Sequence, residues 1–282
     1  MKLTEEQYNQ LIDQAIAEDL GTGDCTTDAL IPESQKGTAT IRAKADGVLA
    51  GVEVARQVFL KIDPDLEVDI LIEDGTPLKT GDAIARIEGK FASLLKAERT
   101  ALNFLQHLSG IATETAHYAE AIKGLHAKIV DTRKTIPGLR ALEKYAVLVG
   151  GGQNHRMNLG DGILIKDNHL KALRSQGLSM KEIVAKARAG STAGLRVEVE
   201  AKSTEEAVEA ADAGADIVML DNMSLDDMRR TVGLIKGRCL IEASGGVNLD
   251  RVRAIAETGV DIISAGALTH SPRALDINMK LD

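Results

Sequence analysis

Cationic side chains cluster in one stretch of this chain. Between residues 131 and 174 there are eight Lys or Arg and only four Asp or Glu, whereas the whole chain of 282 residues has a net charge of −8. A cationic island in an acidic protein indicates an anionic small molecule as the ligand, because a nucleic-acid-binding protein normally carries a broad basic face. Arg and Lys gathered together are typical of a site for carboxylates and phosphates.

Polar residues also recur at the ends of apolar segments. Six segments have the composition of buried strands: residues 128–131, 162–166, 196–200, 216–221, 239–242 and 261–264. The polar residues at or just beyond their C-terminal ends are Arg133, Lys134, Lys166, Glu200, Asp221, Glu242, Ser244, Ser264 and Gly266. A lone charge of this kind is usually a solvated loop residue. The carboxyl ends of parallel strands, however, form the rim where ligands bind. Polar residues at the ends of all six segments therefore favour an active site at this rim.

The acids on this rim have two interpretations. Glu200 and Asp221 interrupt otherwise apolar strands. Their carboxylates suit Mg²⁺ together with pyrophosphate or ribose oxygens. Alternatively, they form ion pairs with Lys134 or Lys166 in the mouth of the barrel.

Two glycine-containing turns follow neighbouring strands. Ser244-Gly245-Gly246 and Ser264-Ala265-Gly266 favour a phosphate cradle, because glycines let backbone amides approach an anion. The alternative is a pair of tight turns. Lys166 is also compatible with a Schiff-base lyase, since barrel aldolases use a strand-end lysine, but its cationic surroundings argue equally for anion binding.

Several other classes of site are not indicated. His155 and His169 lack the spacing and partners of a zinc site, and no P-loop motif occurs. Cys25 and Cys239 form no CxxC pair, so a reducing cytoplasm is expected. The N-terminus lacks the apolar core of a signal peptide, and no apolar run has membrane-spanning length. We therefore expect a soluble protein that binds neither membranes nor nucleic acid.

The elements that would position these residues form two regions. A capping box at Thr4 precedes a helix with an apolar stripe over residues 8–16, and residues 36–90 have the short alternating strands of a β-rich domain with a helix at 54–60. A long helix from Ser93 is expected to break at Ser109-Gly110, which gives a domain boundary at residue 110. Beyond it, strands alternate with helices, which indicates a parallel sheet. Six strands rather than eight predict an α/β fold with an irregular, incomplete β/α barrel.

Eight short motifs are spread over nearly the whole chain. They are Glu18-Asp19-Leu20-Gly21-Thr22-Gly23-Asp24, Glu98-Arg99-Thr100-Ala101-Leu102-Asn103, Asp131-Thr132-Arg133-Lys134-Thr135, Gly151-Gly152-Gln153-Asn154-His155-Arg156, Lys166-Asp167-Asn168-His169, Val197-Glu198-Val199-Glu200, Leu220-Asp221-Asn222 and Ala243-Ser244-Gly245-Gly246. In residues, order and spacing these motifs resemble those of the quinolinate phosphoribosyltransferase family, and their order and spacing make the resemblance specific.

This resemblance implies a fold and a reaction. Residues 1–110 would form an open α/β sandwich and residues 111–282 the barrel with the active site, with the last helix able to pack back on the first domain. The reaction joins quinolinate to phosphoribosyl pyrophosphate with Mg²⁺, and it gives nicotinate mononucleotide, pyrophosphate and CO₂ for NAD biosynthesis. The minimum unit would be a homodimer, with Arg99 reaching the site of the neighbouring subunit.

The resemblance also assigns roles residue by residue. Arg133, His155, Arg156 and Lys166 would bind the two carboxylates of quinolinate. Lys134, Glu200 and Asp221 would face the phosphoribosyl group and its metal, with Glu200 and Asp221 holding Mg²⁺ largely through the substrate. The phosphate would be bound by Ser244, Gly245, Gly246, Ser264, Ala265 and Gly266. Thr132 belongs to the substrate-binding set, and Lys134, Lys166, Glu200 and Asp221 form the catalytic set.

Three alternatives stay open at this point. One is a paralogous phosphoribosyltransferase with another anionic acceptor, and another is the lyase that uses Lys166. A third is a lipoyl- or biotinyl-type carrier, which residues 46–51 and 73–82 faintly resemble. Lys90 lacks the flanking residues of a modifiable lysine, so the carrier is the weakest of the three.

Overall fold

The structure, a computed structural model, describes residues 3–192 and 194–282, which group into two compact units. The first unit contains the residues up to Ala116, Thr135–Gly151 and Leu268–Asp282, and the second contains His117–Lys134 and Gly152–Ala267. Within the described residues, no helix is both long enough and apolar enough to cross a membrane.

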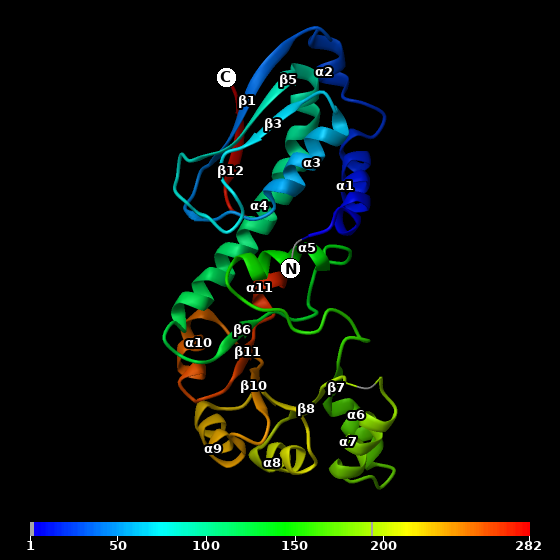
Figure 1. The fold of residues 1–282 in the computed structure, drawn as a ribbon, viewed down its shortest axis with the longest axis vertical. Coiled ribbons are helices and arrows are strands. Elements are labelled where there is room, and N and C mark those ends of the chain that lie inside the picture. Colours follow the sequence, from blue (N-terminus) through cyan, green and yellow to red (C-terminus); the bar gives the residue numbers. More distant parts are fainter. Residues whose placement is uncertain (1–2, 193) are drawn as a thin grey trace. The chain divides into compact units, whose positions relative to one another are not determined.

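The first unit is built on a four-stranded antiparallel sheet with the order β12-β1-β5-β3. Its elements, two of which extend beyond the limits of the unit, are α1 (Glu5–Leu20), α2 (Cys25–Leu30), β1 (Lys36–Ala43), β2 (Gly47–Val48), α3 (Val52–Ile62), β3 (Glu67–Ile70), β4 (Pro77–Leu78), β5 (Ala83–Lys90), α4 (Phe91–Ala121), α5 (Arg140–Val149), α11 (Ala267–His270) and β12 (Ile277–Leu281) (Figure 1). The C-terminal segment thus joins the N-terminal sheet as a strand, with Ile41 of β1 opposite Met279 of β12.

The predicted helix break at Ser109-Gly110 is wrong, because α4 runs without interruption for 31 residues. Gly110 has a packing role instead: a Cβ added there would lie 2.2 Å from the carbonyl oxygen of Arg273. Ser109 is fully buried, and its hydroxyl accepts a hydrogen bond from the amide of Ala50 at 3.0 Å. Both residues, which read as helix breakers in the sequence, bring other segments close to the helix.

The second unit is a six-stranded parallel sheet with the order β6-β11-β10-β9-β8-β7. Its elements are β6 (Lys128–Val130), β7 (Ile163–Ile165), α6 (Asp167–Arg174), α7 (Met180–Ala189), β8 (Val197–Ala201), α8 (Thr204–Asp212), β9 (Ile217–Asp221), α9 (Leu225–Ile235), β10 (Leu240–Ser244), α10 (Leu249–Ala256) and β11 (Ile262–Ser264). The six predicted strands are all present, and the predicted α/β fold with an incomplete barrel is confirmed.

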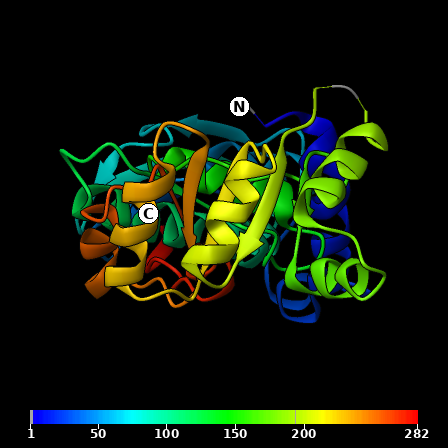
Figure 2. The same ribbon diagram turned by 90° about the horizontal axis from the view of Figure 1, so that it is seen from below.

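The chain reverses in the same way after successive strands. Helices α8, α9 and α10 begin behind Ser203, Ser224 and Asn248, whose side chains accept a hydrogen bond from a backbone amide of the first turn. Gly214 and Gly259, both with positive φ, then lead from helix to strand. Helix α8 lies against β8 and β9, the two strands that it connects (Figure 2), and α10 lies against β11. All strands therefore end at one edge of the sheet.

Candidate active site

A cavity of about 350 Å³ lies at the carboxyl edge of the parallel sheet. Ten of the residues predicted to form the site line it: Thr132, Arg133, Lys134, His155, Arg156, Lys166, Glu200, Asp221, Ser244 and Ser264. They come from all six strands of the sheet or from the segments that follow them, together with the 155–156 segment. The cavity thus collects half of the cationic residues of the 131–174 stretch together with two strand-end carboxylates.

The alternation of side chains along each strand determines which residues reach the barrel interior. Residues two positions apart point to the same face of a strand. Glu200 therefore shares its face with Glu198, and Ser244 shares its face with Glu242. The same rule puts Met219 with Asp221 on β9, and all but Glu198 of these residues line the cavity.

The cations lie close enough together to affect each other. Burial, and secondarily the charge of Arg133, lowers the pKa of Arg156, while Glu198 opposes this shift. The Nη1 of Arg156 donates a hydrogen bond to the carbonyl oxygen of Gly162 at 2.9 Å, which holds the guanidinium in place. A partly desolvated guanidinium beside another cation is stabilised by a bound anion, so the electrostatics favour a polyanionic ligand.

The two acids at the edge lie close enough together for one to affect the other. Burial raises the pKa of Glu200, the charges of Asp221 and Asp167 raise it further, and those of Lys166 and Lys202 oppose the shift. Asp221 in turn accepts a hydrogen bond from the side-chain amide of Asn222 at 2.9 Å. Two carboxylates that repel each other at a ligand cavity suit a divalent cation with oxygen ligands, so this pair is compatible with Mg²⁺.

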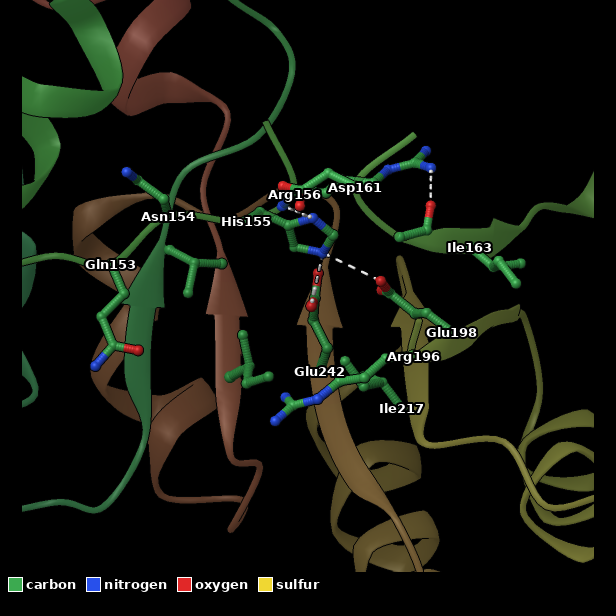
Figure 3. A pocket seen from close by; sticks show the side chains of 13 residues that line it. Gln153, Asn154, His155, Arg156, Asp161, Ile163, Arg196, Glu198, Ile217 and Glu242 are labelled. Carbon is green, nitrogen blue, oxygen red and sulfur yellow. Dashed lines mark hydrogen bonds and ion pairs between the residues drawn. The ribbon is translucent and has the colours of Figure 1, made fainter. Parts of the chain in front are cut away.

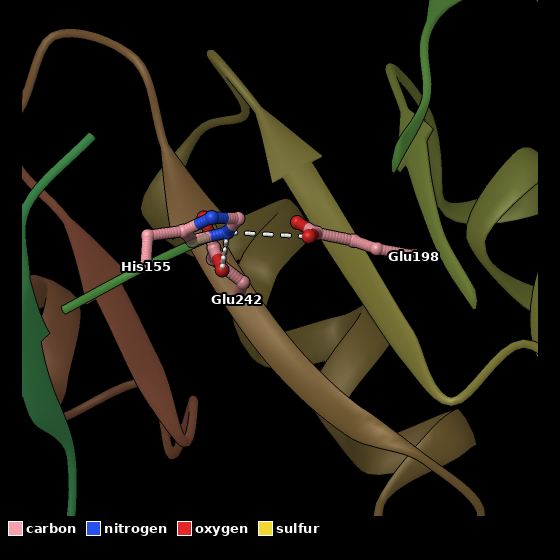
Figure 4. A group of neighbouring side chains, drawn as sticks. All are labelled: His155, Glu198 and Glu242. Atoms are coloured by element: carbon pink, nitrogen blue, oxygen red, sulfur yellow. Dashed lines mark ion pairs between the residues drawn. The ribbon is translucent and has the colours of Figure 1, made fainter. Parts of the chain in front are cut away.

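Below the rim, His155 is held by three buried acids. Its backbone amide donates to Oδ1 of Asp131 at 2.8 Å, and its Nε2 lies 3.2 Å from Glu198 Oε2 and 3.3 Å from Glu242 Oε2 (Figure 4). Glu242 is completely buried and Glu198 is 4% exposed. Burial lowers the pKa of His155, but the two glutamates outweigh it and raise the value to about 10. Burial also raises the pKa of Glu198.

The turn after Ser244 has a backbone conformation that only glycine adopts readily. Gly245 and Gly246 both have positive φ, and a Cβ on Gly245 would lie 2.3 Å from the side chain of Asn222. The hydroxyl of Ser264 is buried and has no hydrogen-bond partner among the described residues, so a ligand oxygen could fill that role. Gly245, Gly246, Ala265 and Gly266 are not among the residues that line the cavity. Arg99, also predicted, is an exposed residue of α4 in the first unit.

Glu198 was not predicted as a site residue, and Glu242 was named at a strand end but was given no role. Both were readable as acids inside apolar strands, and each lies two positions before a residue that was chosen, Glu200 or Ser244. The period of two along a strand was therefore the signal that identifies them.

The chain matches two family models along almost all of its length. The model described as quinolinate phosphoribosyl transferase, N-terminal domain, matches residues 24–109, and that of the C-terminal domain matches residues 111–280. A probable carboxylating nicotinate-nucleotide pyrophosphorylase of Bacillus subtilis is 43% identical over 97% of this chain and 93% of that protein. A mitochondrial decarboxylating quinolinate phosphoribosyltransferase of Nicotiana tabacum is 41% identical over 95% of this chain and 80% of its own. The crystal structure of NadC from Streptococcus pyogenes has a TM-score of 0.95 at 44% identity and covers 100% of this chain and 99% of that one.

Proposed function

Since this chain belongs to the quinolinate phosphoribosyltransferase family, as its motifs predicted, we propose how the residues of its rim cavity carry out that family's reaction. The enzyme transfers the phosphoribosyl group of phosphoribosyl pyrophosphate to quinolinate and releases CO₂, pyrophosphate and nicotinate mononucleotide on the route to NAD. The observation that carries the assignment of residues is the rim cavity, in which several cations lie opposite two carboxylates.

The cations bind the acceptor. Quinolinate has two adjacent carboxylates, which repel each other and the pyrophosphate of the second substrate. Arg133 and Arg156 offer planar forks that match carboxylates, with His155 and Lys166 beside them in the same cavity. The pKa of Arg156 is lowered by burial and secondarily by the charge of Arg133, and this supports the role, because a bound carboxylate stabilises the charged guanidinium.

The acids and Lys134 take the donor. Glu200 and Asp221 face the ribose and would hold Mg²⁺, which when bound would neutralise charge on the leaving pyrophosphate. Burial, and secondarily the charge of Asp221, raises the pKa of Glu200, and this cost to its charged form supports a cation at this place. Lys134 acts as a point charge for phosphate, and the Ser244 and Ser264 turns, with Gly245, Gly246, Ala265 and Gly266, hold the 5-phosphate.

Charge development suggests an order of events. As pyrophosphate leaves, C1 of the ribose becomes positive, and the carboxylates of Glu200 and Asp221 stabilise it as in glycosidases. The ring nitrogen of quinolinate then bonds to C1 and becomes cationic. We place decarboxylation after this step, because the adjacent positive nitrogen stabilises the electron pair that CO₂ leaves on ring carbon C2.

The reaction is tested by the release of labelled CO₂ from quinolinate. Release should require phosphoribosyl pyrophosphate and should produce one nicotinate mononucleotide per CO₂. Nicotinate, which lacks the second carboxylate, is the matched control acceptor and should be converted at least tenfold more slowly. Equal use of nicotinate, or CO₂ release without phosphoribosyl pyrophosphate, would contradict the proposal.

We also propose a homodimer in which Arg99 reaches the site of the partner subunit, and a cytoplasmic location. Arg99 is an exposed arginine outside the barrel unit, and both cysteines are free thiols. The variants Arg99→Ala and Lys134→Ala should each be inactive alone. When their subunits are exchanged, the mixture should recover up to about a quarter of the wild-type activity, because about half of the dimers are mixed and each mixed dimer has one intact site of two. No recovery, with subunit exchange verified, would rule out the shared site.

A further inference from the structure

Charged side chains stand at every second position of β8 and of the residues that flank it: Arg196, Glu198, Glu200 and Lys202. Residues two positions apart point to the same face of a strand. Arg196 and Glu198 line a second cavity, of about 280 Å³, toward the start of the strands, and Figure 3 shows Glu198 directed toward His155. Glu200 lines the rim cavity. Lys202 continues this series, one step farther toward the open end of the barrel.

The pairing of β8 with its neighbours places Lys202 beside two acids of the rim. In the register of β8 and β9, Ala201 lies opposite Leu220, so the residues that come next, Lys202 and Asp221, are neighbours. On the side of β7, Asp167 is the first residue of α6, and its Oδ2 accepts a hydrogen bond from Nζ of Lys202 at 2.7 Å. Lys202 is therefore a cation of the rim, although it was not predicted as a site residue.

The ammonium of Lys202 is held by an ion pair that is easily exchanged. Its side chain is 54% exposed and that of Asp167 is 43% exposed, so water screens the pair and the pair contributes little to stability. The hydrogen bond and the charge of Asp167 raise the pKa of Lys202, and the charges of Glu200 and Asp221 raise it further, while desolvation opposes the shift. Lys202 thus stays charged, lies in the field of both rim acids and can leave Asp167 at a small cost.

The geometry of the transfer determines where an additional cation is useful. In a direct displacement, the acceptor nitrogen approaches C1 of the ribose from the side opposite the leaving pyrophosphate. His155 and Arg156, two of the groups assigned to the acceptor, line the second cavity as well as the rim cavity, so the acceptor lies at the deep end of the rim cavity. The pyrophosphate then lies toward the open end of the barrel, beyond Glu200 and on the side of Lys202.

We propose that Lys202 binds the pyrophosphate group of phosphoribosyl pyrophosphate, and that it leaves Asp167 for this purpose when the substrate enters. This inference rests on the proposed function and adds a substrate-binding residue to it. A lysine ammonium suits phosphate as a compact point charge, and the several charges of pyrophosphate attract it more strongly than one carboxylate does. After the exchange, Asp167 keeps the hydrogen bond from the amide of Asn168 at 2.7 Å and its favourable place in the first turn of α6.

The contact is tested by isothermal titration of three ligands into the whole protein. Lys202→Gln removes the charge but keeps the hydrogen bond that the backbone amide of residue 202 donates to Glu206 at 3.0 Å. Kd for phosphoribosyl pyrophosphate should rise about three- to tenfold, as for one charged contact at an exposed site. Kd should stay within twofold for quinolinate and for ribose 5-phosphate, which lacks the pyrophosphate. Lys202→Arg should keep Kd for phosphoribosyl pyrophosphate within about twofold of the wild type, because it keeps the charge.

The exchange of partners is tested at Asp167. Asp167→Asn releases the ammonium of Lys202 before the substrate arrives and also removes a charge that repels the substrate. The lost repulsion acts in any background, whereas the release of the ammonium matters only where Lys202 is present. Asp167→Asn should therefore lower Kd for phosphoribosyl pyrophosphate more in the wild type than in Lys202→Gln. An equal effect in the two backgrounds would overturn the exchange.

The control is Lys186→Gln, which removes one exposed lysine charge in the last turn of α7 and should leave all three Kd values within twofold of the wild type. If Lys202→Gln binds phosphoribosyl pyrophosphate within twofold of the wild type, Lys202 forms only a surface ion pair and the proposal is wrong. Equal weakening of quinolinate and ribose 5-phosphate would also overturn it, because it would indicate a general loss of positive potential. A wild type that neither binds phosphoribosyl pyrophosphate nor converts quinolinate would instead refute the proposed function.

Discussion

Replacement of Arg156 by lysine tests the assignment of the acceptor site most directly. Lysine keeps the positive charge but loses the planar fork, so the substitution separates charge from geometry. The guanidinium is well placed for the test, because one nitrogen is committed to the carbonyl oxygen of Gly162 at 2.9 Å and the group lines the rim cavity.

The expected loss follows from the hydrogen bonds involved. A fork that binds a carboxylate with two N–H groups loses one charged hydrogen bond when lysine replaces it, which costs about 1.5–3 kcal/mol. At about 1.4 kcal/mol per factor of ten, Kd for quinolinate should rise about 10- to 150-fold. The carbonyl oxygen of Gly162 also loses its donor, which adds to the cost if the ammonium does not reach it.

Isothermal titration of quinolinate into each variant measures this effect. The matched control is Arg229→Lys on α9, where the arginine is half-exposed and pairs with Asp226 one turn away; its Kd should stay within twofold of the wild type. If Arg156→Lys binds quinolinate within threefold of the wild type, the fork does not hold the acceptor. An equal weakening of phosphoribosyl pyrophosphate binding would also contradict the assignment, because it would indicate a general loss of positive potential.

Two further predictions concern stability. Gly110→Ala should destabilise the chain by about 1–3 kcal/mol in urea unfolding, because the added methyl group would meet the carbonyl oxygen of Arg273. The control is Gly233→Ala in α9, which has open space around it and should stabilise the chain by about 0.5–1 kcal/mol. Equal effects of the two substitutions would contradict the packing role of Gly110. The pKa of His155 beside Glu198 and Glu242 is about 10 in the folded protein, whereas an unfolded histidine has a pKa near 6.5. The folded state therefore binds more protons than the unfolded state between these two pH values. The free energy of unfolding should therefore fall as pH rises from 7 to 9, with at most about 1.4 kcal/mol per pH unit coming from the group of His155, Glu198 and Glu242. It should fall less steeply in Glu242→Gln. Identical slopes in the variant and the wild type would show that this group retains no proton.

Much of the second unit could be predicted from the sequence because its signals are local. Each strand is a short apolar run, and α8, α9 and α10 each begin after a Ser or Asn that caps the helix. The joints at Gly214 and Gly259 repeat the same backbone turn. Once the sheet is parallel, the strand-end residues must share one edge, so most of the rim cavity followed without any knowledge of the register.

The errors arose where distant segments decide the outcome. Glycine is a residue type that often ends a helix, which is why a break was predicted at Gly110. In the structure its lack of a side chain instead lets residues 273 and 274, more than 160 positions away in the sequence, pack against the helix. The pair of Glu198 and Glu242 depends similarly on β8 and β10 lying on either side of β9. No local sequence pattern specifies the order of strands in the sheet. The proximity of the two carboxyl groups therefore could not be predicted, even though each acid stands out within its apolar strand.

Buried acids beneath an anion-binding site need a physical reason, because their charge opposes that of the ligand. A buried carboxylate costs free energy unless it is paired, so Asp131, Glu198 and Glu242 would weaken both folding and binding if they did nothing else. Asp131 fixes the backbone of His155, and the two glutamates fix its ring. This restraint aligns the 155–156 segment that presents Arg156 to the cavity. The two glutamates also raise the pKa of His155 to about 10. Because the imidazole then carries a positive charge, it partly offsets the charge of the buried acids and adds a cation beneath the anion-binding cavity.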